Sequence, residues 1–364
     1  MKRNYEKTDA WYTVDGPDSD VTLSSRVRFA RNLDGFIFPL KIKSDDAERV
    51  QSIILDAFNH LESPEHYQTV RMSSIDALGR RILSERGILH SDSGSEPWRA
   101  VILRNDGLAS VTVNMDDHLR ISSFSSGLSL DASGRLAREI TDSLSTRIRY
   151  ACDPDFGYLS TSPFDCGTGM KASILVCLPA LHLNGLLDRV IRESLAQGLS
   201  VRGFYGQKDG SSLGSLYQIS TLASTSGTEE SQIQLLQEAC EKIITLERRS
   251  RKELMDKRPT FCEDIVFRAI TTAKYARFIS FPEAVELLER LRFGLSANMI
   301  SGIDNLEINA LLYRIQNAHM SFLIQGSDVT IEEDVTSEEE RMDRMRTMVI
   351  QEVLKKADIR ERRN

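Results

Sequence analysis

Hydrophobic residues recur along this chain with two periods, and each period predicts one type of element. Strands are predicted from short alternating or apolar runs, over residues 110–114, 118–124, 171–178, 200–205 and 215–221. Helices are predicted where apolar residues lie three and four positions apart, over residues 45–61, 131–150 and 184–199. A tight turn joins the first two strands, and a glycine-bearing loop joins the last two. This part of the chain therefore mixes strands and helices.

The remainder of the chain has an almost purely helical pattern. Thr228 is a residue type that caps helices, and Glu229 and Glu230 would lie beside the positive end of the helix dipole. That long helix is predicted to stop before Pro259, and further helices are predicted over residues 262–278, 282–293, 307–324 and 337–362. The pattern predicts an α+β fold, with a larger domain over residues 1–256 and a smaller all-helical domain over residues 257–364.

Composition and charge narrow the class of protein. The 364 residues are 41% hydrophobic and 27% charged, which is typical of a globular chain of about two domains. A net charge of −7 argues against a general nucleic-acid binder. No apolar run approaches the ~18 residues of a membrane span, and the first residues lack a signal-peptide core. Five scattered cysteines without a CxxC pair indicate neither a disulfide framework nor a zinc site, so a cytoplasmic location is expected.

Two arginines at alternate positions mark the first segment with candidate chemistry, residues 24–28. On an extended chain, Arg26 and Arg28 point to the same face. Neighbouring guanidinium groups repel each other unless an anion lies between them, and a polyphosphate is well suited to that place. Taken alone, the segment also suits a solvated basic edge.

The predicted hairpin carries a second polar constellation. Asp116 and Asp117 lie at its turn, and Arg120 lies on the returning strand. These polar residues lie where a plain core would be apolar. Taken alone, the turn also suits a surface loop with a local ion pair.

Two glycine-bearing loops complete the candidate chemistry. Gly167 and Gly169 leave backbone N–H groups free shortly before Lys171, an arrangement that suits phosphate, although the Walker spacing is absent. The loop after Arg202 is typical of a flexible lid between two strands. An ordinary glycine-bearing connection is the alternative interpretation of each loop.

Taken in order, these segments resemble the ATP:guanidino phosphotransferase (phosphagen kinase-like) family, and most of all its protein arginine kinase branch. The matching stretches are SSRVRFARNL (24–33), NMDDHLRI (114–121), GYLSTSPFDCGTGMKAS (157–173), LPAL (178–181), VRGFYG (201–206) and LGSLYQIS (213–220). The helical tail, including LRFGLSANMISGI (291–303), is similar to the protein arginine kinase branch. The resemblance covers most of the chain and implies an antiparallel-sheet catalytic domain followed by the helical domain.

The resemblance implies an enzyme that transfers the γ-phosphate of ATP to arginine side chains of proteins, with ATP and Mg²⁺ as cofactors. Such transfer needs in-line positioning and neutralisation of charge more than covalent help. No residue is expected to be a dedicated metal ligand. The residues implied to surround ATP are Ser24, Ser25, Arg26, Val27, Arg28, Arg120, Lys171, Ala172, Ser173, Ile174, Leu175, Arg202, Gly203, Phe204, Tyr205, Gly206 and Gln207.

The carboxylates that would assist the acceptor guanidinium depart from the family pattern NEEDHLR. Asp116 would take the place of the catalytic glutamate, one methylene shorter, and Met115 replaces the other glutamate. Gln207 replaces a glutamate of the lid, so it can orient a guanidinium but cannot accept its proton. Because the lid has one extra residue, Asp209 is a candidate for the missing carboxylate. The catalytic candidates are Asp116, Gln207 and Asp209.

Other departures leave the function open between hypotheses. Lys171 replaces an arginine and loses its bidentate fork, and Gly87 stands where the family often has a histidine. One hypothesis is an active kinase for arginine in proteins. Another is a degenerate homologue that keeps the fold and acts as a nucleotide-binding, regulatory or interaction protein. A kinase of free guanidino metabolites is a third.

The C-terminal domain carries further expectations from the resemblance. Asp343 and Arg346 remain from the RDxxRA signature of a phosphoarginine pocket, although a charged helix face is the alternative. The resemblance also implies a homodimer, a small activator protein and the protein quality-control protease machinery as partners. Apolar residues of the tail suit a dimer contact, namely Leu311, Leu312, Ile315, Phe322 and Ile324.

Overall fold

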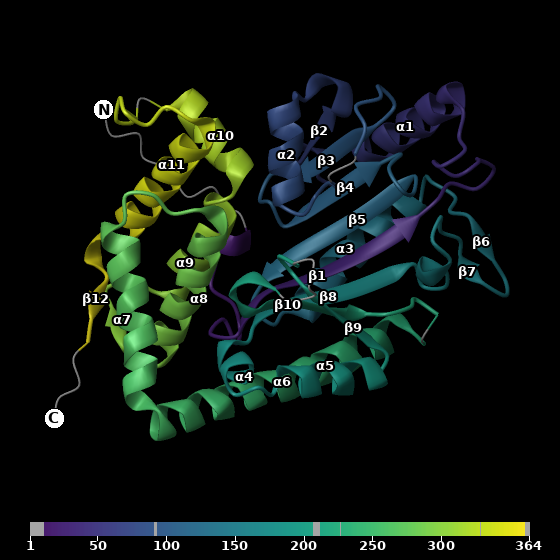
Figure 1. Ribbon diagram of the computed structural model, residues 1–364. Helices are drawn as coiled ribbons and strands as arrows, with labels where there is room; N and C mark the ends of the chain where they lie inside the picture. Colours follow the sequence, from purple (N-terminus) through teal and green to yellow (C-terminus); the bar gives the residue numbers. More distant parts are fainter. Residues whose placement is uncertain (1–10, 91–92, 207–211, 226, 328, 361–364) are drawn as a thin grey trace.

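An eight-stranded antiparallel sheet forms the centre of the larger part of the molecule (Figure 1). The computed structural model describes residues 11–90, 93–206, 212–225, 227–327 and 329–360. The strand order is β2-β3-β4-β5-β1-β8-β10-β9. These strands are β1 (Thr22–Arg31), β2 (Tyr67–Arg71), β3 (Ala100–Arg104), β4 (Ala109–Val113), β5 (Leu119–Ser126), β8 (Met170–Cys177), β9 (Leu199–Gly203) and β10 (Leu216–Thr221). The predicted hairpin is confirmed, because β4 pairs with β5.

Helices cover one face of this sheet and continue into a second, helical part. The helices are α1 (Ser44–Asn59), α2 (Ala77–Glu85), α3 (Leu130–Ser145), α4 (Pro179–Leu183), α5 (Leu187–Ala196), α6 (Glu229–Lys257), α7 (Pro259–Tyr275), α8 (Phe281–Ser296), α9 (Asn305–Arg314), α10 (Asn317–Gly326) and α11 (Glu338–Val353). Two short strand pairs complete the elements, namely β6 (Cys152–Asp153) with β7 (Gly157–Tyr158), and β11 (Ile300–Ser301) with β12 (Asp358–Ile359). The α+β class with a helical C-terminal region is confirmed.

The two faces of the sheet differ because side chains alternate along each strand. Val27 and Phe29 of β1 and Ile174 of β8 are buried in a hydrophobic core that includes residues of α1, α3 and α6. Burial of this apolar surface, worth about 25 cal/mol per Å², holds the helices against the sheet. Arg26 and Arg28 therefore point to the opposite face, which we call the arginine face.

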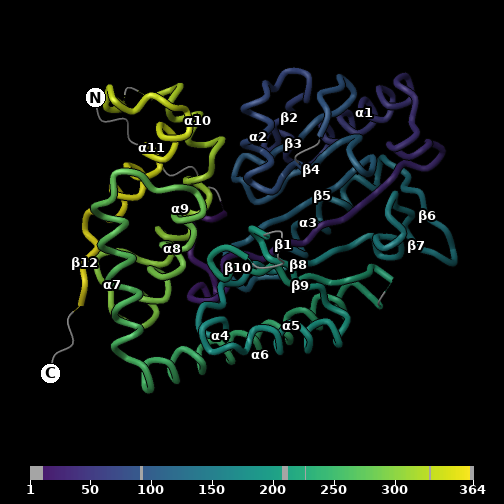
Figure 2. Tube along the Cα trace, in the orientation of Figure 1, coloured from purple at the N-terminus to yellow at the C-terminus, as the bar shows by residue number. Residues whose placement is uncertain are grey.

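The helices α7 to α11 pack around a second core at one end of the sheet (Figure 2). The N-terminal turn Trp11–Thr13 joins the two parts, since Trp11 stacks on Phe124 of β5 and Tyr12 stacks on Tyr313 of α9. The junction between α6 and α7 lies at Arg258. The domain boundary after residue 256 stays a prediction, and it falls next to this junction.

The charged stretch in α6 is continuous helix because its polar residues have buried partners. Glu247 is fully buried and accepts hydrogen bonds from the backbone N–H groups of Ala180 and Leu181, at 3.0 and 2.9 Å. These are orphan donors at the start of α4. Arg251, one turn further along α6, pairs with Asp20 at 3.0 Å. The charged stretch of α6 therefore packs against two neighbouring segments.

Two predicted helix ends are wrong, and one predicted helix is divided in two. The helix predicted to reach residue 150 ends at Ser145, and that predicted to reach residue 362 ends at Val353. The helix predicted over residues 307–324 is two helices, α9 and α10. Gln316 between them is extended, with φ −71° and ψ 155°, so the helical hydrogen-bond ladder is interrupted. The apolar period continues across this break and gives no sign of it.

The tail residues expected at a dimer contact are mostly in the core. Leu311, Leu312 and Ile315 are at most 4% exposed, and they cannot form an intermolecular face. Phe322 of α10 is 52% exposed and is still available for a contact between two chains. No helix in the described part of the chain is both long enough and apolar enough to cross a bilayer.

Candidate active site

The register of the central strands brings three distant segments together on the arginine face. Arg28 of β1 lies opposite Lys171 of β8, and Arg26 lies opposite Ser173. On the other side of β1, Arg120 of β5 lies opposite Ala30, two residues along from Arg28. We call Arg26, Arg28, Arg120 and Lys171 the cationic cluster.

Arg202 lies outside this cluster, on the edge strand β9. It is exposed and lies opposite Gln218 of β10. Gln218 in turn lies opposite Leu175 of β8, so Arg202 is aligned with Leu175 and not with Lys171. Its charge nevertheless contributes to lowering the pKa of Lys171, after burial and the repulsion by Arg28. Arg202 is thus placed to approach the cluster from the lid side.

The positive charges of the cluster are only partly compensated, by Asp165 beside Arg28 and by Asp116 and Asp117 beside Arg120. Burial, followed by repulsion from Arg28 and Arg120, lowers the pKa of Arg26 to about 9. Burial and then Arg120 lower the pKa of Arg28 to about 10, although Asp165 opposes the shift. Arg26 donates to Ser122 Oγ at 3.0 Å and stacks on Phe124, while its Nε finds no partner among the described residues. Buried cations with free donors form a site for an anion.

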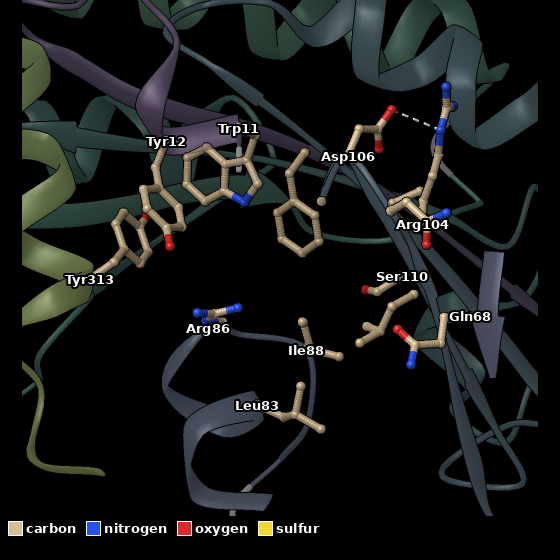
Figure 3. A pocket seen from close by; sticks show the side chains of 15 residues that line it. Trp11, Tyr12, Gln68, Leu83, Arg86, Ile88, Arg104, Asp106, Ser110 and Tyr313 are labelled. Atoms are coloured by element: carbon tan, nitrogen blue, oxygen red, sulfur yellow. Dashed lines mark ion pairs between the residues drawn. The ribbon is translucent and has the colours of Figure 1, made fainter. Parts of the chain in front are cut away.

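A cavity of about 280 Å³ opens beside Arg26, between the sheet, the segment after α2 and the C-terminal helices. Six residues expected to surround ATP line it, namely Ser24, Arg26, Ser173, Leu175, Phe204 and Tyr205. A second cavity of about 310 Å³ shares Trp11, Arg86, Phe124 and Tyr313 with the first. Figure 3 shows that aromatic rings lie along one side of the second cavity, with Gln68, Arg104 and Asp106 on another. Together the two cavities have the volume of a small-molecule site.

Several residues expected to surround ATP have side chains on the opposite face. Ser25, Val27, Ala172 and Ile174 are buried toward the core. The Ser25 hydroxyl, for example, donates to Gly127 O at 2.8 Å, under the sheet. These positions can offer a nucleotide only backbone atoms. Gly203 and Gly206 have no side chain to offer, and Gln207 and Asp209 lie outside the described residues.

The adjacent aspartates of the hairpin turn have different roles. Asp117 is fully buried, and its Oδ1 accepts hydrogen bonds from Asn32 Nδ2, Ser160 Oγ and Thr161 N at 2.9, 3.0 and 2.8 Å. Asp116 has a side chain that is 49% exposed and forms an ion pair with Arg120. Asp117 therefore braces three segments, and Asp116 is the carboxylate that a substrate can reach.

His118, the next residue, supports the same corner. Its Nδ1 accepts from Leu33 N at 3.1 Å, and its Nε2 then donates to Ile37 O at 3.1 Å. Burial lowers the pKa of His118 to about 4, so the ring stays neutral near pH 7. This histidine therefore orients a loop.

Two titratable residues at the site were not singled out from the sequence. Asp165 pairs with Arg28 at 3.3 Å, and His90 lies 3.4 Å from a carboxylate oxygen of Asp116. A carboxylate inside a presumptive phosphate loop was the available signal for Asp165. The sequence contained no signal for His90, because the segment that carries this residue reaches the site only through the tertiary fold.

That segment, residues 86–90, is held in place by Glu85 at the end of α2. The Glu85 carboxylate accepts hydrogen bonds from Ala318 N at 2.7 Å and His319 N at 3.2 Å. These N–H groups are orphan donors in the first turn of α10, whose own N-cap residue Gln316 makes no side-chain cap bond in the described structure. Gln316 instead donates to Glu85 O at 3.2 Å. Glu85 therefore ties the helical part to a segment that lines both cavities.

Replacing Glu85 with glutamine is expected to lower the free energy of unfolding by about 1 kcal/mol, because the amide offers α10 one acceptor oxygen where the carboxylate offers two. Amide hydrogen exchange over residues 86–90 should become faster, since this segment loses its tether. Glu48→Gln, at an exposed position of α1, is the matched control. Equal unfolding midpoints and equal exchange for the two variants would show that Glu85 does not hold the segment.

Asp343 and Arg346, expected at a phosphoarginine pocket, form an ion pair in the helical part. Arg346 is 1% exposed, and its guanidinium donates to Ile315 O at 2.8 Å, to Ile279 O at 2.9 Å, to Asn317 Oδ1 at 2.6 Å and to Asp343. These donors are used to join α11 to the junction between α9 and α10. The arrangement is that of a structural ion pair, and phosphoarginine binding by Asp343 and Arg346 stays a prediction.

No group of three or more metal-ligating side chains is present among the described residues. Mg²⁺ is usually held by phosphate oxygens and water, with few protein ligands. The cationic cluster suits the phosphates themselves. The site therefore fits a magnesium ion that arrives as part of the Mg–ATP substrate.

Comparison with known proteins agrees with this geometry. The family model "ATP:guanido phosphotransferase, C-terminal catalytic domain" matches residues 49–250, and "Protein-arginine kinase McsB C-terminal domain" matches residues 259–364. The protein-arginine kinase of Pelotomaculum thermopropionicum is 36% identical over 85% of this chain and 88% of its own. That of Moorella thermoacetica is 33% identical over 92% of this chain and 97% of its own.

Solved structures share the fold of the larger part. A duplicated taurocyamine kinase from Schistosoma mansoni, with bound transition state analog components, matches with a TM-score of 0.57 at 25% identity, over 64% of this chain and 34% of its own. This chain thus spans about a third of that duplicated protein. Lombricine kinase matches with a TM-score of 0.55 at 22% identity, over 63% and 67% of the two chains.

The sheet, the cationic cluster and these matches define a phosphotransferase of guanidino groups: the chain belongs to the ATP:guanido phosphotransferase family. Within that family it belongs with the protein-arginine kinases, which it resembles over both the catalytic and the helical part.

Proposed function

We propose that this protein transfers the γ-phosphate of Mg–ATP to arginine side chains of other proteins. The observation that carries the proposal is the cationic cluster, whose buried charges lack sufficient counter-charge and lie beside a cavity lined by the residues expected at ATP. A triphosphate supplies that counter-charge. The relatives named protein-arginine kinases, which match the helical part as well, support a protein substrate.

The proposed roles follow from the chemistry of phosphoryl transfer. Arg26, Arg28 and Arg120 neutralise the phosphate oxygens, and Lys171 adds a point charge from the neighbouring strand. Asp116, half-exposed beside Arg120, grips and aligns the acceptor guanidinium. When the phosphates bind Arg120, they compete with Asp116 for its donors, and the carboxylate is freed for the substrate. Asp165 competes for Arg28 in the same way.

A transfer assay tests the proposal. Incubation with Mg–ATP and an arginine-rich protein should produce acid-labile phosphate bound to nitrogen, and a lysine-rich protein of equal charge should remain unlabelled. Free arginine in place of the protein distinguishes a metabolite kinase. ATP should also raise the unfolding temperature through ligand linkage. Stabilisation by ATP without transfer would contradict the proposal and would support the degenerate, nucleotide-binding alternative.

The same proposal contains the finer predictions from the resemblance. The protein is proposed to use ATP and Mg²⁺ as cofactors and to be located in the cytoplasm. The protein is predicted to form a homodimer and to have a small activator protein and the protein quality-control protease machinery as partners. Sedimentation of the full chain tests the dimer, for which the exposed Phe322 offers a contact.

A further inference from the structure

His90 lies directly beside the carboxylate that is expected to hold the substrate. Its Nε2 is 3.4 Å from Asp116 Oδ2 and 3.1 Å from Arg120 Nη1. The side chain is 71% exposed and borders a small hollow that is also lined by Arg26 and Thr112. A guanidinium gripped by Asp116 therefore comes within reach of the imidazole as well.

His90 Nε2 lies near both a donor and a carboxylate oxygen, and we assign the form of the ring from the shorter contact, the one with Arg120. A guanidinium can only donate hydrogen bonds, so Nε2 acts as the acceptor and carries a lone pair. The proton of the neutral ring is then on Nδ1. His90 thus presents a basic nitrogen toward the site from the solvent side.

The charged groups around His90 favour this neutral form. Burial lowers its pKa below the ordinary value of 6.5, the charge of Asp116 opposes the shift, and Arg120, Arg28 and Arg26 reinforce it. On the α2 side, Arg80, Arg81 and Glu85 border the same surface groove as His90. The ring is therefore unprotonated near pH 7 and able to accept a proton.

We propose that His90 is the base that removes the proton from the acceptor guanidinium, a role that rests on the proposed kinase function. In this step, the bond between the guanidinium Nη and Pγ forms. The bond between Pγ and the β,γ-bridging oxygen breaks, and its electron pair leaves with ADP. The Nη proton passes to His90 Nε2, and the exposed ring then releases it to water.

The other groups at the site are less suited to this task. Asp116 is the carboxylate that grips the guanidinium, and Asp165 is ion-paired with Arg28 on the far side of the cluster. Imidazole has a pKa closer to neutral pH, which makes it the better general base. Binding of phosphate by Arg120 also frees the Nε2 lone pair, so the base becomes available when the nucleotide is in place.

His90→Gln keeps the size and polarity of the side chain but cannot accept a proton. We expect kcat for arginine phosphorylation to fall by about 10²-fold or more, with KM for ATP changed by less than about twofold. The parent enzyme should lose activity as pH falls through the His90 pKa, and this acid limb should be absent from the variant. Imidazole added to His90→Ala should restore part of the rate. His60→Gln, at the exposed C-cap position that follows α1, is the matched control.

The outcomes separate the inference from the function on which it rests. If the parent phosphorylates arginine and His90→Gln keeps its kcat and its acid limb, His90 is not the base and only the inference fails. If Asp209→Asn abolishes activity while His90→Gln does not, the base is the lid carboxylate. If the parent forms no phosphoarginine, the proposed function fails, and the role of His90 fails with it.

Discussion

An Arg26→Met variant is expected to unfold at a higher temperature than the parent and to phosphorylate arginine about 10²–10³-fold more slowly. The guanidinium of Arg26 is buried beside two other arginines, and both burial and repulsion lower its pKa to about 9. A depressed pKa of a cation means that folding disfavours its charge, so removal of the charge stabilises the apo protein. Methionine keeps an unbranched apolar stem beside Phe124 and removes the guanidinium that lies over its ring. The loss of a phosphate donor lowers kcat.

Calorimetry and the transfer assay measure the two effects on the same preparations. Arg138→Met is the control, because Arg138 of α3 pairs with Glu229 and Glu230 at 2.7 and 2.9 Å on the other side of the sheet. That variant should unfold at an equal or lower temperature and keep its activity. A destabilised Arg26→Met protein with normal kcat would mean that Arg26 is a structural residue and not part of an anion site.

The cluster illustrates how a functional site can be unfavourable in the absence of its ligand. Like charges persist at such positions because the surrounding sheet determines where the side chains lie. The anion then provides the missing counter-charge, so binding and stability are coupled. Asp165 and Asp116 partly fill that place in the apo protein, by pairing with Arg28 and Arg120.

Local patterns in the sequence were sufficient to predict where most side chains of the cationic cluster lie. The alternation of Arg26 and Arg28 placed both on one face, and the hairpin placed Arg120 on the returning strand. The opposite orientation of Val27 and Ala172 follows from the same alternation, although a list of contiguous motif residues conceals it. A binding segment in a strand offers only every second side chain to the site.

Other features depend on contacts between segments distant in the chain. Asp116 and Asp117 are neighbours in the sequence, yet only the fold shows that Asn32 and Ser160 hold the second of them. His90 reaches Asp116 because Glu85 ties its segment to α10, some 230 residues away. No periodicity records such pairs, since each residue taken alone is an ordinary polar residue of a loop or helix end.

Loss of the Arg346 side chain is expected to have the largest effect on stability. Its guanidinium donates to two buried carbonyl oxygens, to Asn317 and to Asp343, and all of these lose their partner in Arg346→Met. Breaking a buried, hydrogen-bonded charge pair costs about 3–5 kcal/mol. Denaturant unfolding should show that loss, with α10 and the segment after Glu85 exchanging their amide hydrogens faster. Arg341→Met, at an exposed position of the same helix, should unfold like the parent. If Arg346→Met instead unfolds like the parent but no longer binds phosphoarginine, the residue serves a ligand pocket and the structural role is wrong.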